Sequence, residues 1–366
     1  MKFILRTIIP LCLACLVRPG QAMEAAKPGI GPRTPLIEHT AYGESLNFDI
    51  IADNPASEAL EITQLEVEYL DGGGATLLAR RLDVNSGAIR TIPERRIEPH
   101  QVRMVYNPFP VLPRGLHPAA VRATVWLSKP DAKYLPVGHL EFAAKRTFTA
   151  PVADRPTPHL LLPLQGRVWV WDGHDLYSHH RCWNYAHPAA RALGYISNMD
   201  RYAYDFVLVD SRNRMAAHED DERNEDYVGY KAPVRAVADG TVLQMRSSEP
   251  DNRTFDEKSS KINPLYSFGN YILLDHGGGV YSVFGHLHQG SVRVKVGDRV
   301  RRGEKIGEVG SSGSSLFPHL HYEMIDGYRP GGEGLPSYFD GLVRIRGTAR
   351  ETVSGSIDSG DIVEAR

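Results

Sequence analysis

Apolar and polar residues alternate in several short runs within the first part of the chain. The alternation is regular at residues 60–62, 65–69 and 121–127, and a period of two is typical of a strand with one buried face. Turn-forming clusters such as residues 71–74 (DGGG) separate these runs. Short strands at this spacing predict an antiparallel β-sandwich of immunoglobulin-like type over residues 41–150.

Strand-like runs return after a proline-rich stretch. Residues 151–165 (PVADRPTPHLLLPLQ) are predicted to form a linker. Beyond it, a strand-like run at residues 202–209 and a hairpin-like run at residues 232–242 predict further β structure, and we expect a second domain at residues 166–346. The mixed stretch at residues 23–40 is predicted to be a loose lead-in, and the polar stretch at residues 347–366 a tail. We therefore expect a mainly β protein with two domains.

Composition agrees with two folded domains and narrows the range of partners. The chain has 366 residues, of which 42% are hydrophobic, so it can bury a sizeable core. Its 34 glycines and 25 prolines favour short strands and turns over long helices. A net charge of −2 gives no electrostatic basis for binding nucleic acid, and we predict no nucleic-acid partner.

The first 22 residues have the pattern of a secretory signal peptide. Lys2 and Arg6 precede a short apolar run at residues 8–17, and small residues favour cleavage after Ala22. The mature chain would then hold one cysteine, Cys182, and hence no intrachain disulfide. No later apolar run is long enough for a transmembrane segment. We expect an exported protein of the periplasm or cell envelope, or a secreted one.

Candidate chemistry lies in two His-x-His pairs, His286/His288 and His319/His321. In a strand, residues two apart point to the same face, so each pair could direct two imidazoles into one groove. A third strand-like run at residues 202–209 contains Asp205. Histidines together with one carboxylate form a ligand set that suits zinc with one coordination position left open.

The stretch from Gly285 to Met324, GHLHQGSVRVKVGDRVRRGEKIGEVGSSGSSLFPHLHYEM, resembles the lysostaphin-type (LytM-like) zinc metallopeptidases. Upstream, the runs at residues 203–206 (AYDF) and 233–240 (PVRAVADG) fit the same family, so the resemblance covers roughly residues 165–343. Enzymes of this family cut peptide bonds in bacterial cell-wall peptidoglycan. The resemblance implies a lysostaphin-like antiparallel β domain in the C-terminal half and a Zn²⁺ cofactor.

The resemblance also assigns roles to residues. It makes Asp205 and His321 zinc ligands, and His286 and His319 catalytic histidines. One of these two would exchange a proton with water or the leaving amine, and the other would stabilise the oxyanion.

The third zinc ligand of the family departs from its usual place in this chain. The family places a histidine four residues before the aspartate, where this chain has Arg201, which has no lone pair for a metal. The resemblance instead favours a ligand from the upstream segment at residues 177–181. In an extended segment His179 and His180 point to opposite sides, so one of them should face the metal. We expect His180, with His179 as the alternative.

Together these features predict a zinc-dependent endopeptidase that hydrolyses peptide bonds of peptidoglycan, with the peptidoglycan peptide as substrate. The departure at Arg201 leaves an alternative open. In that alternative the protein is a catalytically inactive envelope protein that binds peptidoglycan or activates a partner cell-wall hydrolase.

Overall fold

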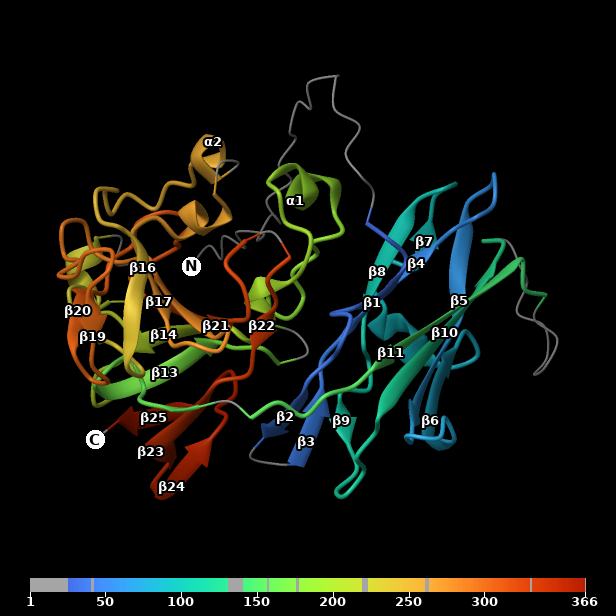
Figure 1. Cartoon of the computed structure of the whole chain (residues 1–366), viewed down its shortest axis with the longest axis horizontal. Helices are drawn as coiled ribbons and strands as arrows, with labels where there is room; N and C mark the ends of the chain where they lie inside the picture. Colours follow the sequence, from blue (N-terminus) through green and yellow to red (C-terminus); the bar gives the residue numbers. More distant parts are fainter. Residues whose placement is uncertain are drawn as a thin grey trace, which may run out of the picture.

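The structure is a computed structural model that describes residues 26–40, 43–130, 141–156, 158–175, 178–218, 223–260, 263–329 and 331–365. The predicted signal peptide at residues 1–22 lies outside these residues. The described chain is mainly β, as the alternation of apolar residues predicted, and Figure 1 shows strands in two bodies side by side. No helix within the described ranges is long and apolar enough to cross a membrane.

The N-terminal body is built from three sheets. The first has the order β1-β4-β8, the second β2-β3-β9, and the third β11-β10-β5-β6, with β7 also paired to β5. The strands are β1 (Gly29–Gly31), β2 (Ile37–Thr40), β3 (Gly43–Leu46), β4 (Asp49–Asp53), β5 (Leu60–Leu70), β6 (Thr76–Asp83), β7 (Arg96–Ile97), β8 (Val102–Tyr106), β9 (Val111–Leu112), β10 (Ala120–Ser128) and β11 (Ala144–Pro151).

The core of this body is filled by alternate side chains of its long strands. Leu65 and Val67 of β5 and Val121 and Ala123 of β10 are fully buried, and they pack with Ile50 of β4 in one cluster. The residues between them carry charge and face solvent, which is why the period of two was readable in the sequence. The immunoglobulin-like type of this body stays a prediction.

The C-terminal body is organised around one large sheet with the order β12-β23-β25-β13-β14-β21-β18-β17-β16-β19. In addition, β22 pairs with β21, β24 pairs with β23, and β15 and β20 form a separate pair. The strands are β12 (His159–Leu160), β13 (Gly166–Asp172), β14 (Tyr204–Leu208), β15 (Pro233–Arg235), β16 (Gly240–Arg246), β17 (Tyr271–Asp275), β18 (Tyr281–Gly285), β19 (Arg299–Val300), β20 (Lys305–Glu308), β21 (Leu320–Ile325), β22 (Gly334–Leu335), β23 (Tyr338–Arg346), β24 (Ala349–Gly355) and β25 (Ile362–Ala365).

Helices are few and short in the described chain. They are α1 (Pro188–Ala192), α2 (Glu257–Ser260) and the 3₁₀ helices η1 (Gly87–Thr91), η2 (Met199–Tyr202), η3 (Asn224–Asp226) and η4 (Pro264–Phe268). Helix η2 leads directly into β14, and η4 precedes β17, so both lie next to strands at the centre of the large sheet.

Three segments expected outside the two domains are parts of sheets. The lead-in contains β1 and β2, and the linker contains β12, which runs parallel to β23. The expected tail forms β24 and β25, and β25 lies between β13 and β23. Its polar composition concealed this, because Ile357 and Val363 are its only buried apolar residues within the described chain. The domain limits at 41–150, 151–165 and 166–346 stay a prediction.

The two bodies share a third cluster of buried apolar side chains. Ile51 of β4 and Met104 of β8 come from the N-terminal body, and Tyr185 and Met199 from the segment that leads to β14. Phe268 of η4 belongs to the same cluster. The N-terminal sheet therefore packs against the segment between β13 and β14.

Candidate metal centre

Asp205 and His321 face each other on neighbouring strands at the centre of the large sheet. They are register partners of β14 and β21, and His321 Nδ1 lies 3.2 Å from Asp205 Oδ1. Both side chains are almost completely buried. Their neighbours Tyr204 and Tyr322 point to the opposite face, into the main core, as alternation along a strand requires.

His180 completes a group of three with these two residues. Its Nε2 lies 3.5 Å from Asp205 Oδ1, and single ligand atoms of His180, Asp205 and His321 all lie within 4.8 Å of one another. His180 Nδ1 donates to the carbonyl of Gly173 at 3.0 Å, so a neutral His180 has its lone pair on Nε2. That buried nitrogen has no hydrogen-bond partner in the described structure.

His179 lies beside this group in a different environment. Its Nε2 is 3.7 Å from Asp205 Oδ2, but its Nδ1 contacts Asp172 and its side chain is 58% exposed. An extended segment would have directed His179 and His180 to opposite sides. The chain turns at residues 178–182 instead, and the two rings lie 3.9 Å apart between centroids. Both histidines therefore face Asp205, and only His180 is buried with it.

His286 and His319 lie next to the group of three. Their ring centroids are 4.7 Å apart, and His319 Nε2 lies 3.4 Å from Asp205 Oδ1. His286 Nδ1 donates to the carbonyl of Ser312, and His319 Nδ1 to that of Phe317, each at 2.8 Å. Because a carbonyl only accepts, each Nδ1 carries a proton and each Nε2 remains available for chemistry.

Backbone conformation sets the direction of His286. It follows the last residue of β18 with a φ of +57°, a left-handed conformation that is uncommon for residues other than glycine. This turn ends the alternation of the strand and separates His286 from His288. Residues held in this way are frequent at functional sites, where the surrounding structure fixes them.

Burial and charge shift the pKa values of this group in opposite directions. Burial, followed by the charges of His319 and His321, lowers the pKa of His286 well below its usual value. Burial alone would raise the pKa of Asp205, but His180 and His319 lower it well below its usual value. Asp205 is therefore ionised, and His286 is neutral at neutral pH.

Two carboxyl groups next to His321, of buried Glu323 and half-buried Asp200, were not predicted from the sequence. Glu323 is on β21, and its Oε2 lies 3.9 Å from His321 Nε2. Asp200 of η2 forms a group of three with these residues. Burial raises the pKa of Glu323 to about 8, and burial and then Glu323 raise that of Asp200 to about 7. Extending the alternation of 319 and 321 by two residues would have indicated Glu323.

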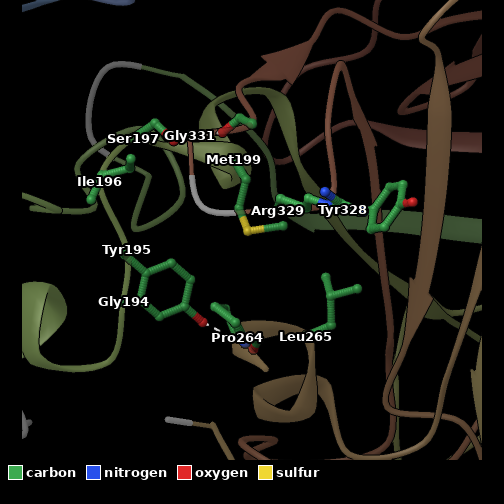
Figure 2. A pocket seen from close by; sticks show the side chains of 11 residues that line it. Gly194, Tyr195, Ile196, Ser197, Met199, Pro264, Leu265, Tyr328, Arg329 and Gly331 are labelled. Atoms are coloured by element: carbon green, nitrogen blue, oxygen red, sulfur yellow. Dashed lines mark hydrogen bonds between the residues drawn. The ribbon is translucent and has the colours of Figure 1, made fainter. Parts of the chain in front are cut away.

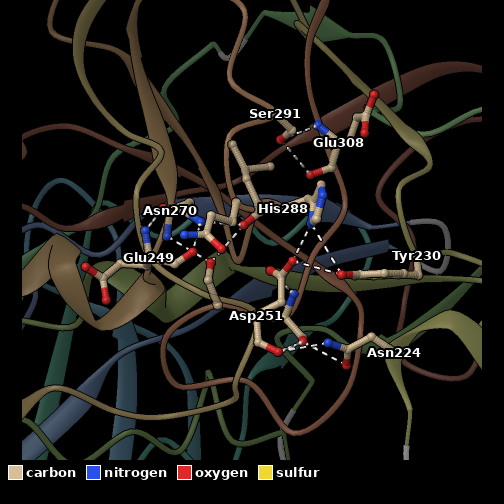
Figure 3. A network of polar contacts seen from close by, with 12 residues as sticks. Asn224, Tyr230, Glu249, Asp251, Asn270, His288, Ser291 and Glu308 are labelled. Atoms are coloured by element: carbon tan, nitrogen blue, oxygen red, sulfur yellow. Dashed lines mark hydrogen bonds and ion pairs between the residues drawn. The ribbon is translucent and has the colours of Figure 1, made fainter.

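His288 does not join the histidine cluster. Its Nδ1 contacts Asp251 on the loop after β16, and the hydroxyl of Tyr230 donates to the same carboxylate at 3.0 Å (Figure 3). The other oxygen of Asp251 accepts the backbone amide of Ser311 at 3.1 Å. His288 and Asp251 thus connect the loop to the Gly/Ser-rich turn that precedes His319.

A small pocket lies apart from these residues, between the segment 194–199 and residues 328, 329, 331 and 332 (Figure 2). Its walls include Tyr195, Met199 and Leu265, and the hydroxyl of Tyr195 donates to the carbonyl of Pro264 at 3.0 Å. None of the candidate site residues lines it.

A comparison with known protein families covers three of the histidines described above. Residues 226–331 match the family model described as Peptidase family M23. This range contains His286, His319 and His321. His180 and Asp205 lie upstream of it, so their place in the site rests on the geometry above.

The matches to curated relatives cover only part of each relative's sequence. The Peptidoglycan DD-endopeptidase ShyA of Vibrio cholerae is 32% identical over 128 residues, which cover 35% of this chain and 28% of that protein. The Glycyl-glycine endopeptidase ALE-1 of Staphylococcus capitis is 33% identical over 99 residues, covering 27% and 23%. The chain thus spans about a quarter of the length of these two relatives.

Among solved structures, the catalytic domain of lysostaphin from Staphylococcus simulans is similar at 22% identity. The similarity covers 44% of this chain and 80% of that chain, with a TM-score of 0.24. The family match and the curated relatives agree with the resemblance read from the sequence. The part of the chain that holds His286, His319 and His321 matches the model of Peptidase family M23, which agrees with the resemblance to lysostaphin-type peptidases.

Proposed function

We propose that this protein is a zinc-dependent endopeptidase that hydrolyses peptide bonds of bacterial cell-wall peptidoglycan. The observation that carries the proposal is the buried group of His180, Asp205 and His321 with His286 and His319 beside it. The relatives ShyA and ALE-1 are named as endopeptidases, which supports hydrolysis of a peptide bond as the class of reaction. One is a DD-endopeptidase and the other a glycyl-glycine endopeptidase, so we propose the class of substrate and not the bond that is cut.

The residues present fit a zinc ion. Two imidazoles and one carboxylate are a common zinc ligand set that leaves one position open. His180 Nε2 is buried, has its lone pair toward Asp205 and has no hydrogen-bond partner among the described residues. A metal ligand is the simplest role for such a nitrogen. Bound zinc supplies Lewis acidity, which polarises a scissile carbonyl and acidifies water.

His286 and His319 would handle the protons. Each imidazole is oriented by a carbonyl at Nδ1, so Nε2 is the nitrogen that each ring has left for chemistry, and the two ring centroids lie 4.7 Å apart. One Nε2 would accept a proton from the attacking water, and the other, when protonated, would donate a hydrogen bond to the oxyanion. Both rings are almost completely buried, which strengthens these interactions by excluding water.

We further propose that the protein acts outside the cytoplasm, in the periplasm or cell envelope or after secretion. The sequence of residues 1–22, with its charged start and short apolar run, supports export. A peptidoglycan substrate requires the same location.

The proposal is tested with purified, zinc-loaded protein and isolated sacculi. We expect release of soluble muropeptide fragments by the wild type. His286→Ala and His319→Ala should each retain zinc and lose about 100-fold or more of the rate, the usual contribution of a general acid or base. His117→Ala, an exposed histidine of the N-terminal body, is the control and should behave as the wild type.

A wild-type protein that holds zinc and leaves sacculi intact would contradict the enzyme proposal. The inactive binding protein would then be the better account, and an effect seen only with a partner hydrolase present would support it.

A further inference from the structure

A single carboxylate of the N-terminal body lies between two buried arginines of the C-terminal body. Asp49 Oδ1 is 2.7 Å from Arg181 Nη1, and Asp49 Oδ2 is 2.8 Å from Arg201 Nη2. The side chains of all three are fully buried. Arg201 Nε also lies 3.3 Å from Glu333 Oε2. Arg181 therefore pairs with Asp49, whereas Arg201 is shared between Asp49 and Glu333.

Arg181 is held by the N-terminal body at every nitrogen of its guanidinium. Its Nη1 contacts Asp49, its Nε donates to Asn47 Oδ1 at 3.2 Å, and its Nη2 donates to the carbonyl of Phe48 at 2.7 Å. The guanidinium also lies 5.3 Å from the ring centroid of Tyr106 on β8. A planar fork bound at three positions fixes the direction of the side chain as well as its location.

The two arginines stand next to the candidate zinc ligands in the chain. Arg181 directly follows His180, and Arg201 lies four residues before Asp205, at the end of η2. The two segments also contact each other, because Asn198 Nδ2 donates to the carbonyl of His180 at 3.1 Å. One carboxylate thus fixes both chain segments that bring ligands to the site from outside the M23 match.

We propose that Asp49 is a positioning residue for the metal centre, so that the N-terminal body is part of the site and not an appended module. Asp49 holds Arg181, which fixes the turn carrying His180, and it holds Arg201, which fixes the entry to β14 and Asp205. This inference rests on the proposed function, because it takes His180 and Asp205 to hold zinc.

The proposal also accounts for the residue at position 201. The family resemblance places a zinc-binding histidine there, and this chain has an arginine directed at Asp49. In this chain the residue at position 201 would hold the segment that brings Asp205 to the site instead of holding the metal. His180 would serve as the third zinc ligand instead. Asp49 of β4 also fixes Arg181, the residue that follows His180.

The test measures zinc affinity of the full chain by competition with a chromophoric chelator. Asp49→Asn is compared with Asp53→Asn, a matched control at the other end of β4, where Asp53 pairs with Arg146 at 2.6 Å. We expect Asp49→Asn to weaken zinc binding by about 10- to 100-fold, the range known for residues that orient metal ligands. Asp53→Asn should bind zinc as the wild type does.

If Asp49→Asn lowers the thermal midpoint and leaves the zinc affinity unchanged, Asp49 only joins the two bodies and the proposal is overturned. A wild type that does not bind zinc would instead remove the proposed function itself. The two failures are therefore distinguishable.

A second measurement uses the wild type and stays decisive if Asp49→Asn does not fold. Coupling between two sites is reciprocal, so zinc should stabilise the contact that Asp49 makes. We expect added zinc to slow hydrogen exchange of the amides of β4 and leave those of β6 unchanged. Slower exchange confined to residues 178–185 and 204–208 would overturn the proposal.

Discussion

At the scale of single residues, the assignment of the third ligand can be tested between neighbours. His180 is buried with a lone pair toward Asp205, whereas His179 is 58% exposed and bound to Asp172. We expect His180→Ala to reduce bound zinc from about one per chain to nearly none, because a tetrahedral site with three protein ligands tolerates no loss. His179→Ala should retain zinc. The control is His159→Ala, an exposed histidine that also pairs with an aspartate; equal losses in His179→Ala and His180→Ala would contradict the assignment.

Some of the candidate site residues could be predicted from the sequence, because they lie in strand-like runs or in a family motif. The structure brings His286, His319, His321 and Asp205 together, whereas His288, the second histidine of the pair 286/288, contacts Asp251 instead. The roles of the four residues stay predictions. The contacts of Asp49 could not be predicted from the sequence, because contacts between residues more than a hundred positions apart leave no periodic signal.

At the scale of elements, the C-terminal stretch predicted to be a tail is a part of the main sheet. Ile357 is fully buried in the core beneath that sheet, between β24 and β25. We expect Ile357→Ala to lower the free energy of unfolding by about 2–5 kcal/mol, because it leaves a cavity in a packed core. Val296→Ala, at a site 64% exposed, should change it by less than about 0.5 kcal/mol. Denaturant unfolding measures both changes. An equally small change for Ile357→Ala and Val296→Ala would contradict the packing of this segment in the core.

The strands themselves were predictable where one face is buried and the other solvated. β5 and β10 show this alternation, and their runs were read correctly. β24 has exposed and half-buried residues throughout, so its composition is that of a loop, and only its pairing with β23 makes it a strand. Pairing between distant strands is a property of the fold and not of the local sequence.

At the scale of the whole molecule, a second buried ion pair joins the two bodies and should make their contact depend on pH. His174 contacts Glu38 of β2, and Asp175 and Asp358 add negative charge. Burial lowers the pKa of His174, but Glu38 raises it to a net value of about 9. A raised pKa in the folded state gives stability that is complete below the unfolded value, about 6.5, and is lost as pH rises toward 9. We expect the difference in thermal midpoint between wild type and His174→Gln to shrink over this range; a constant difference from pH 6 to pH 9.5 would contradict the assignment.

The bridge of Asp49, Arg181 and Arg201 has a consequence for recombination between related proteins. A chimaera that exchanges residues 26–156 for the N-terminal part of a relative without an acid at position 49 would leave Arg181 without the carboxylate that pairs with it, and Arg201 with Glu333 alone. A chimaera that restores histidine at position 201 alone would leave half of the Asp49 carboxylate without its partner. Buried charges left in this way are strongly destabilising. The three residues should therefore be inherited together. An exchange of parts between relatives should keep Asp49, Arg181 and Arg201 from the same protein, and a boundary in the proline-rich stretch between the two bodies would separate them.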